Sequence, residues 1–519
     1  MAQPRSRHDR RRRGVRMSLL ALILVAAWLA MGLWQRHKPL PEGVDVAWPM
    51  RQAGDVQLLV DETWYDAEGR AHQHQAIFDE ALSMIAQAQR LIVLDMFLFN
   101  DFAGNADGEG MRALSSELSE ALIRQKHQHP ELVARVITDP INTLYGALMP
   151  EHLARLREAG VELVITDLSR LRASNPLWSG LWHLGLNRLG NEQGGGWLPN
   201  PLGPGQVTLR SYLSMANFRA NHRKNLVVDQ GDSWAGLVTS ANPHDASSRH
   251  DNVALRFSGQ AALDLLASER LLVNWSGGAD SPSAGWSLSD QWPEASAVQA
   301  RGVTVSETKD GAADASLRIL TEAAIRDALL SRIKQARIGD RLDIAVFYFS
   351  HRPLIEVLKA ASARGVAVRV LLDPNREAFG MQKSGIPNRP VAAELADAGL
   401  EVRWCLTQGE QCHGKLLLYR ETIGSGAMPS GAEPSRAAMI LGSANFTRRN
   451  LDNLNLETSV ELVGDQYTAA IEEAIVLFER HWFSSETRRT SLPLSSTAEV
   501  SQWARWRYRL MEASGLSTF

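Results

Sequence analysis

The stretch 221-NHRKNLVVD-229 decides how the chain is organised, because a second version of it follows as 412-CHGKLLLYR-420. Each begins with a histidine and a lysine two residues apart and then becomes aliphatic. Residues i and i+2 of a strand project from the same face. We therefore predict two strands, each of which presents an imidazole and an ammonium group side by side at one end.

The repeat extends beyond these two strands, since four further pairs of segments match in the same order. The pairs are 94–100 with 344–350, 131–140 with 365–374, 156–166 with 395–405, and 235–242 with 438–445. An ordered set of matches predicts an internal duplication. In each half, short apolar strands alternate with helices such as 76–90 and 353–365, which predicts an α/β fold with a largely buried sheet per half.

Length and composition agree with this organisation. A chain of 519 residues exceeds one typical core, so two domains or two fused halves are expected. With 45% hydrophobic and 22% charged residues it is globular. The net charge of −3 gives no general attraction to nucleic acid, whose binders carry a basic surplus. A nucleic-acid partner is therefore disfavoured, although a local basic groove remains compatible with the sequence.

The N-terminus carries a membrane signal. Residues 18–34 are seventeen residues without a charge, just long enough to span hydrocarbon. Seven arginines precede this run and few cations follow it, so the positive-inside rule predicts a single-pass anchor in the inner (cytoplasmic) membrane, with the rest of the chain on the periplasmic, extracytoplasmic side. A cleaved signal peptide and a twin-arginine export signal are the alternatives, but the apolar run is long and both patterns are poor matches.

A Ser-x-Asn segment follows the His-x-Lys strand in each half, so cationic and neutral donors are expected to converge. Such a set suits a phosphate, whose non-bridging oxygens accept from lysine, serine and asparagine. Lysine is not a usual metal ligand, and we predict neither a metal nor a cofactor. The predicted catalytic pairs are His222, Lys224, His413 and Lys415, and the predicted phosphate-binding residues are Ser240, Asn242, Ser443 and Asn445.

At these residues the sequence resembles the phospholipase D superfamily, whose signature is His-x-Lys-x4-Asp followed by Gly/Ser-x-Asn, given twice. Within it, the chain looks most like bacterial membrane-associated members of the cardiolipin synthase and phospholipase D type. The resemblance covers about residues 56–480. The first copy is complete with Asp229, whereas Arg420 replaces the second aspartate. That position lies at the far end of the strand from the histidine, where we expect a structural role.

The resemblance implies two fused phospholipase D-type α/β/α sandwich halves with one shared active site, so a monomer suffices. One histidine would attack phosphorus and the other would protonate the leaving alcohol; water or a second alcohol would then resolve the phosphohistidine. The substrate class it implies is phospholipid, either hydrolysed to phosphatidic acid or transferred to an alcohol such as glycerol or phosphatidylglycerol. A periplasmic nuclease or other phosphodiesterase is the alternative, and a catalytically retired binding protein is a third.

Glu457 differentiates the two halves. It follows Asn445 at the distance where the family places a carboxylate that bonds the catalytic imidazole, and Ala254 is its first-half counterpart. We predict that Glu457 partners His413, which favours the imidazolium form of a general acid, and that His222, without a carboxylate, is the nucleophile. Asn252 and Asn455 are in register with each other and are either orienters of the site or buried structural amides.

Three further features bear on membrane and redox context. Leucines and tryptophans of 177–190 form an apolar stripe that fits either an interfacial helix or core packing, and 194–205 fits a lid or gate. The tail 503–511 interleaves aromatic and basic residues and either contacts phosphate groups or packs on the domain.

Cys405 and Cys412 either close a loop beside His413 or remain free. The strand ends 97–101 and 347–350 are expected to be buried near the site, and Asp139 and Asp373 to form turns.

The predicted domains follow from these signals. They are a basic cytoplasmic tail (1–16), a transmembrane anchor (17–35), a linker (36–55), the first half (56–275, with an insertion at 167–220), a second linker (276–312), the second half (313–485) and an amphipathic tail (486–519).

Overall fold

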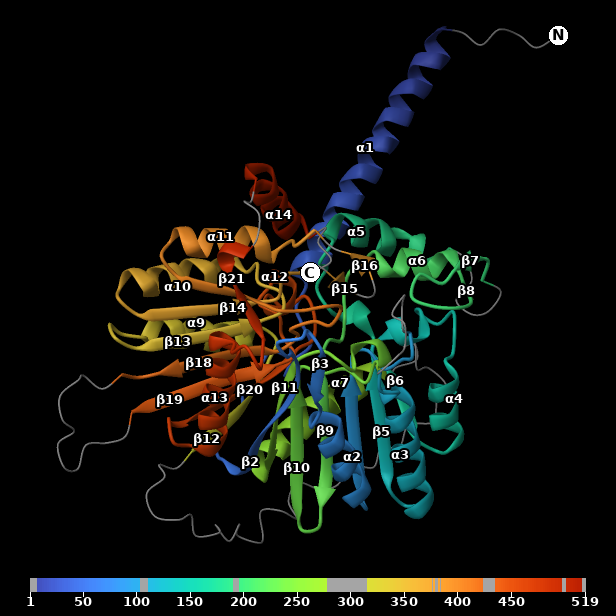
Figure 1. The fold of residues 1–519 in the computed structure, drawn as a ribbon. Coiled ribbons are helices and arrows are strands. Elements are labelled where there is room, and N and C mark those ends of the chain that lie inside the picture. The colour runs from blue at the N-terminus through green and yellow to red at the C-terminus, as the bar shows by residue number, and fades with distance from the viewer. Residues whose placement is uncertain are drawn as a thin grey trace.

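Two large sheets stand face to face in the protein, one from each half of the sequence (Figure 1). The computed structural model describes residues 7–102, 111–189, 196–277, 315–375, 377–378, 381–382, 384–422, 435–496 and 501–515. The predicted linker 276–312 lies outside the described residues except for its first two positions.

The first half forms a sheet in the order β3-β2-β11-β10-β9-β4-β5-β6. Strands β4, β5 and β6 are parallel to one another, and the strands from β4 through β9, β10 and β11 to β2 are antiparallel. The bounds are β2 (Gly54–Tyr65), β3 (Ala71–His74), β4 (Leu91–Met96), β5 (Val133–Thr138), β6 (Glu162–Ile165), β9 (Lys224–Gln230), β10 (Ser233–Thr239) and β11 (Asn252–Ser258).

The second half repeats this sheet, in the order β1-β12-β20-β19-β18-β13-β14-β17-β21. The seven strands from β12 to β17 correspond in order and direction to those from β2 to β6, so the predicted duplication is present in the fold. The bounds are β1 (Arg51–Gln52), β12 (Ser316–Thr321), β13 (Arg341–Val346), β14 (Ala367–Leu372), β17 (Glu401–Cys405), β18 (Lys415–Arg420), β19 (Arg436–Gly442), β20 (Thr458–Asp465) and β21 (Ser491–Pro493), with a small separate pair β15 (Glu377–Ala378) and β16 (Met381–Gln382).

Helices cover the outer face of each sheet and join the halves. The first sheet is covered by α2 (Ile77–Gln87), α3 (Leu114–Gln128) and α4 (Glu151–Glu158), and the second by α9 (Ala323–Gln335), α10 (Arg352–Ala363) and α11 (Asn388–Asp397). Two more helices cross between halves, because α7 (Gln260–Ser276) contacts β12 and α13 (Ala469–Phe483) contacts β2. The α/β class predicted from the sequence is confirmed.

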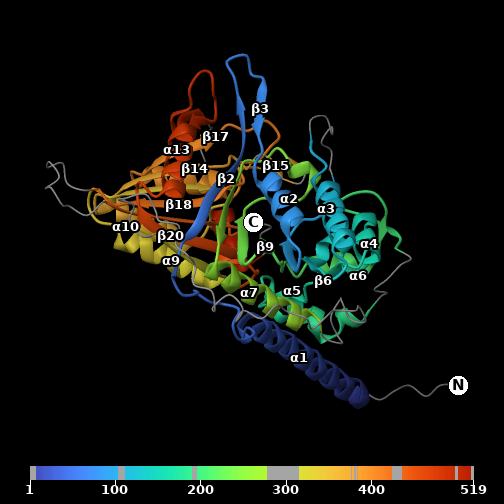
Figure 2. The same ribbon diagram turned by 90° about the horizontal axis from the view of Figure 1, so that it is seen from below.

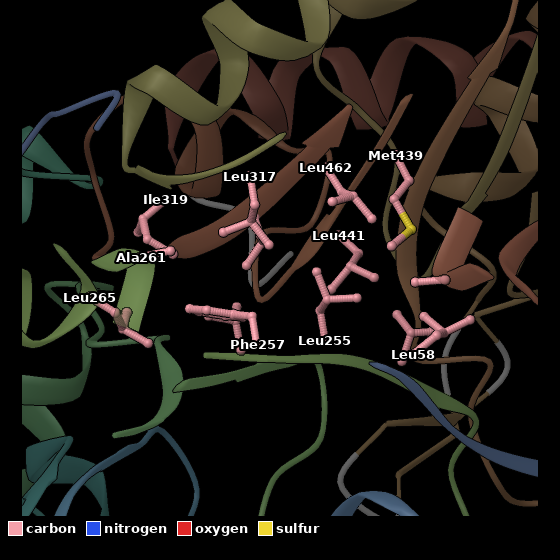
Figure 3. Packing of buried hydrophobic residues seen from close by; sticks show 14 of the residues in the cluster. Leu58, Leu255, Phe257, Ala261, Leu265, Leu317, Ile319, Met439, Leu441 and Leu462 are labelled. Carbon is pink, nitrogen blue, oxygen red and sulfur yellow. The ribbon is translucent and has the colours of Figure 1, made fainter. Parts of the chain in front are cut away.

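The inner faces of the two sheets share one apolar core. Leu58, Leu255 and Phe257 from the first half lie opposite residues of the second half such as Leu317 and Leu441 (Figure 3). All are buried, and burying one such side chain stabilises a fold by roughly 1.5–3 kcal/mol. The halves are therefore fixed against each other, which a site shared between them requires.

Helix α1 (Arg7–His37) projects away from the body and is long and apolar enough to cross a membrane (Figure 1). Its last turn is bonded to the body. The Gln35 carbonyl accepts from the Ala173 N–H at 2.8 Å, and Gln35 Oε1 accepts from Arg219 at 2.9 Å. Residues 44–53, part of the predicted linker, then run along the second half, where β1 pairs with β12. The end of α1 is thus bonded to the body of the protein.

The insertion 167–220 packs beside this helix. It contains α5 (Pro176–Leu184), α6 (Leu209–Met215) and the short strands β7 (Leu198–Pro199) and β8 (Gln206–Val207). The helix predicted over 177–190 is shorter than expected because Gly185, at φ 153°, ends it, and a 3-10 turn follows. Figure 2 shows α5 alongside α1, and Trp28 Nε1 donates to the Leu177 carbonyl at 2.7 Å. Each helix has a glycine where the two come close, Gly32 in α1 and Gly180 in α5. A Cβ on Gly180 would lie 2.8 Å from the Trp28 carbonyl oxygen.

The apolar stripe of α5 therefore packs neither in the core nor wholly in solvent. Its leucines at 177, 181 and 184 stay exposed beside the anchor. The tail likewise ends in α14 (Gln502–Ser514), which buries Tyr508 against the second half while Trp503 and Trp506 remain exposed. Of the predicted gate 194–205, the described part from 196 onward forms the β7–β8 hairpin.

Candidate active site

The two histidines lie where the halves meet, each two residues before the first lysine of a strand. The His222 N–H donates to the Leu456 carbonyl at 2.9 Å, and the His413 N–H donates to the Asp251 carbonyl at 2.8 Å. Each histidine is thus held by backbone of the opposite half. Both side chains are buried, with 8% of their surface exposed, so they share one enclosed environment.

The imidazole partners also cross between the halves. His222 Nδ1 bonds Glu457 Oε2 at 3.0 Å, whereas His413 Nδ1 bonds Asn252 Oδ1 at 3.0 Å. The prediction that Glu457 partners His413 is wrong. Because Asn221 and Leu456 form a parallel bridge across the interface, the residue at the start of β20 reaches the histidine of the other half rather than its own.

Ser240 and Ser443 support these partners instead of facing a phosphate. Ser443 Oγ donates to Glu457 at 2.5 Å and accepts from the Thr458 N–H. Ser240 Oγ donates to Asn252 Oδ1 at 2.9 Å and accepts from a backbone N–H in the same way. The structure contradicts their predicted phosphate-binding role, since each hydroxyl proton is already committed. They orient the residues that hold the imidazoles.

Asn242 and Asn445 remain candidates for phosphate contact. Asn242 Oδ1 accepts from the Leu98 N–H at 3.3 Å, which leaves its Nδ2 donor for a ligand. Asn445 is buried, and its Oδ1 has no hydrogen-bond partner within the described part of the chain. Because an amide oxygen only accepts, a phosphate contact by either side chain would come from its Nδ2 group.

The lysines lie against both histidines and two aromatic rings. Lys224 Nζ donates to the His222 carbonyl at 2.7 Å, and Lys415 Nζ donates to the His413 carbonyl. Phe97 lies under Lys224 at 5.1 Å and beside the His222 ring at 4.7 Å. Phe347 repeats this arrangement in the second half, at 5.5 Å from Lys415 and 5.1 Å from His413. The strand end 347–350 is therefore buried near the site as expected, whereas in 97–101 Phe97 is only half-buried and Asp101 is exposed.

One family model matches part of the second half. Residues 329–482 match the model of the cardiolipin synthase, phospholipase D-like domain. The match includes His413, Lys415, Asn445 and Glu457. No curated protein matches the chain in sequence.

Solved structures extend the likeness to the whole fold. Phosphatidylserine synthase from Haemophilus influenzae Rd KW20 aligns over 90% of this chain and 96% of its own, with a TM-score of 0.52 at 11% identity. Nuc, a phospholipase D family member from Salmonella typhimurium, aligns over 34% of this chain and 97% of its own, with a TM-score of 0.25 at 18% identity. The synthase therefore shares the overall fold of this chain across both halves.

Burial dominates the electrostatics of this phospholipase D-like site. It lowers the pKa of His222 to about 4, although the Glu457 carboxylate acts to raise it. Burial, and next the charge of Lys415, hold the pKa of His413 well below its usual value. Burial also lowers the pKa of Lys224 to about 7. Burial of these groups thus disfavours positive charge, and a bound phosphate anion would favour it.

Two aspartates have a role that the sequence did not reveal. Asp139 and Asp373 form the predicted turns by accepting from the N–H two residues on, but each also accepts from the residue just before a histidine. Asp139 Oδ2 accepts from the Asn221 N–H at 2.7 Å, and Asp373 Oδ2 from the Cys412 N–H at 2.9 Å. Burial raises the pKa of both carboxyls to about 7. The Asp-Pro pair at the same strand end in each half was the available signal.

The far ends of the two motif strands are structural, as expected. Asp229 accepts from the N–H groups of Arg90 and Leu91, each at 2.8 Å, and so fixes the start of β4. Arg420 instead donates to Asp343 and Glu479. The replacement of aspartate by arginine therefore changes the bonding partners at the far end of β18. It does not affect the end of β18 that lies next to His413.

The remaining site residues brace the crossing segments. Cys405 and Cys412 form a disulfide, and Cys412 directly precedes His413. Asn455 Oδ1 accepts from the Ala220 N–H at 3.1 Å, so it is a tie between the halves and contacts no imidazole. Of the two asparagines predicted as orienters or structural amides, only Asn252 holds a histidine.

Replacing Glu457 by glutamine should lower the rate at which His222, the predicted nucleophile, attacks phosphorus. We expect a loss of about 10- to 100-fold, the usual effect when the hydrogen-bond partner of a functional histidine is altered. A p-nitrophenyl diester has a leaving group that needs no proton. With this substrate, the acid limb of the pH profile of kcat/KM should report the pKa of His222 and lie near pH 4 in the parent. Because Glu457 raises the pKa of His222, the limb should move to lower pH in the variant.

The matched variant is Asn252→Ala, which alters the partner of the other histidine. It should retain most of its kcat/KM for release of p-nitrophenol from the p-nitrophenyl diester, since that step needs no proton from His413, and lose activity on alkyl diesters. Equal losses in both variants on both substrates would contradict distinct roles for the two imidazoles.

Proposed function

We propose that the protein is a membrane-anchored phospholipase D-type phosphodiesterase that acts on phospholipids through a phosphohistidine intermediate. The observation that carries this proposal is the pair of histidine–lysine sets that face each other across the interface, each imidazole held by the opposite half. Such a site can attack a phosphodiester on one side and protonate its leaving group on the other.

In the first step, His222 Nε2 forms a bond to phosphorus while the bond from phosphorus to the leaving oxygen breaks. A carboxylate can only accept, so the bond to Glu457 places the proton on Nδ1 and leaves the Nε2 lone pair for attack. The carboxylate also offsets the positive charge that the phosphorylated imidazole carries. His222 thus stays the proposed nucleophile, but because it has a carboxylate partner rather than because it lacks one.

His413 supplies the proton to the leaving oxygen. Its partner Asn252 is neutral, so its imidazolium is stabilised less and gives up a proton more readily. In the second step, water or an alcohol loses a proton to His413 and attacks phosphorus, and the bond to His222 breaks. Lys224 and Lys415, with the amides of Asn242 and Asn445, bind the non-bridging oxygens as charge develops.

The anchor supports a lipid substrate. Gln35 at the end of α1 accepts from Arg219, three residues before His222, so the site is tied to the helix that enters the bilayer. The disulfide beside His413 fits an oxidising compartment, in agreement with a single-pass inner-membrane protein whose catalytic body is periplasmic. The positive-inside pattern supports the same orientation.

Lipid product analysis tests this proposal. Purified protein and its His222→Ala variant would be incubated with vesicles of phosphatidylglycerol and phosphatidylethanolamine plus a labelled primary alcohol, with a labelled oligonucleotide in parallel. We expect phosphatidic acid or a phosphatidyl-alcohol that is absent with the variant, and their ratio separates hydrolysis from transfer to an acceptor such as glycerol or phosphatidylglycerol. Intact lipids with a shortened oligonucleotide would instead establish a tethered nuclease.

A further inference from the structure

A pocket that includes neither His222 nor His413 lies where the end of α1 meets the second half. Its volume is about 480 Å³, within the range of small-ligand pockets. It is bordered by α10, α12 (Arg448–Leu451) and α14. Four arginines and two acids line it, namely Arg36, Arg352, Arg448, Arg509, Asp452 and Glu512.

The residues that line this pocket carry a formal positive charge, because four arginines stand against two acids. Arg352 pairs with both Glu394 and Glu356, and Arg509 also pairs with Glu394. The guanidinium group of Arg448 donates to the backbone carbonyl oxygens of Glu512 and Ala513, and it makes no ion pair with a carboxylate among the residues that the structure describes. Arg36 is exposed and makes no ion pair within the described ranges.

The two acids that line the pocket are already engaged. Asp452 is bonded by Arg326 and by His351, and a Glu512 carboxylate oxygen accepts from the Arg448 N–H at 2.8 Å. The first residues of α10 also border the pocket, and no side chain caps that helix, so its positive end adds to the field. The pocket therefore has capacity for an anion.

The position of the pocket relative to a membrane indicates which kind of anion it would bind. Arg36 comes two residues after the apolar run 18–34, so once α1 spans a bilayer the pocket lies at the level of the lipid headgroups. Trp503 and Trp506 of α14 are exposed and stack at 5.2 Å, and tryptophan prefers this interfacial layer. Figure 1 shows α14 on the side of the body from which α1 projects.

We propose that this pocket binds the headgroup of an anionic phospholipid and does not take part in catalysis. Guanidinium groups would bind the lipid phosphate, and the neighbouring tryptophans would contact the acyl boundary. The inference rests on the membrane location given under the proposed function, but not on the reaction. Bound lipid would hold the second half against the bilayer, as α5 and α1 hold the first.

Lipid retention by the full-length protein in neutral detergent tests this. Native mass spectrometry would compare added phosphatidylglycerol with phosphatidylcholine for the parent, Arg36→Gln and Arg36→Gln/Arg448→Gln. Affinity for phosphatidylglycerol should fall about fivefold for each arginine removed, in line with the usual contribution of one basic residue at an anionic membrane surface. Phosphatidylcholine binding should change little.

The matched control is Arg124→Gln, which removes an exposed arginine of α3. It should retain phosphatidylglycerol like the parent, and all variants should turn over a soluble p-nitrophenyl diester at the parental rate. Equal lipid retention by every variant would overturn the proposal, as would displacement of the lipid by millimolar inorganic phosphate. A retention difference in a protein that turns over no lipid would leave this proposal standing while the proposed function failed.

Discussion

The His222→Ala protein should form no covalent phosphoenzyme and should lose about 10³-fold or more of its turnover. The substitution removes the proposed nucleophile, and neither Lys224 nor water can replace an oriented imidazole in a buried site. The measurement is transfer of a radiolabelled phosphoryl group from a diester to protein that is denatured at alkaline pH, where the phosphorus–nitrogen bond survives, together with release of the product alcohol.

The His413→Ala protein is the matched comparison. It should still become labelled by a diester with a p-nitrophenyl leaving group, and the label should accumulate, because the base that activates the second nucleophile is missing. Its loss with alkyl diesters should approach that of His222→Ala. Label on the His222→Ala protein, and none on His413→Ala, would reverse the two assignments.

Replacing Arg223 by methionine should destabilise the protein by about 3–5 kcal/mol, the usual result of removing one partner from a buried ion pair. Arg223 is fully buried and bonds Glu322 at 2.8 Å and Glu269 at 3.3 Å. These acids come from different halves, and Glu322 also accepts from the Glu457 N–H. The variant should therefore unfold at lower urea concentration and lose activity together.

The control for this prediction is Arg70→Met, which removes an exposed guanidinium that bonds Asp66 at 2.7 Å. Exposed ion pairs contribute at most about 1 kcal/mol, so its urea midpoint should stay near that of the parent. Similar midpoints for the two variants would mean that the Arg223 cluster does not hold the halves together.

The sequence predicted the features that repeat in the two halves and missed the contacts that cross from one half to the other. The duplicated His-x-Lys and Ser-x-Asn segments indicated the α/β halves and their meeting point, because strand periodicity and motif spacing are local properties. Glu457 was matched with the wrong histidine because alignment of the halves compares positions and not contacts. The serines were misread for the same reason, since their spacing was visible but the partner of each hydroxyl lies in a neighbouring strand.

Other features depended on tertiary context. The stripe over 177–190 predicted a helix, but only the neighbouring anchor shows why its leucines stay exposed beside α1. The pairing of Cys405 with Cys412 required the turn that brings β17 close to the start of β18. Asn252 and Asn455 looked equivalent in register, yet one bonds an imidazole and the other a backbone N–H.

The crossed support of the histidines has a consequence for the biosynthesis of the protein. The first half is made first, but His222 has no carboxylate until residue 457 has been synthesised and packed against it. His413 in turn needs a residue made much earlier. If the proposed function holds, a nascent or truncated chain would therefore present no aligned nucleophile, and activity would arise only when the whole polypeptide had folded.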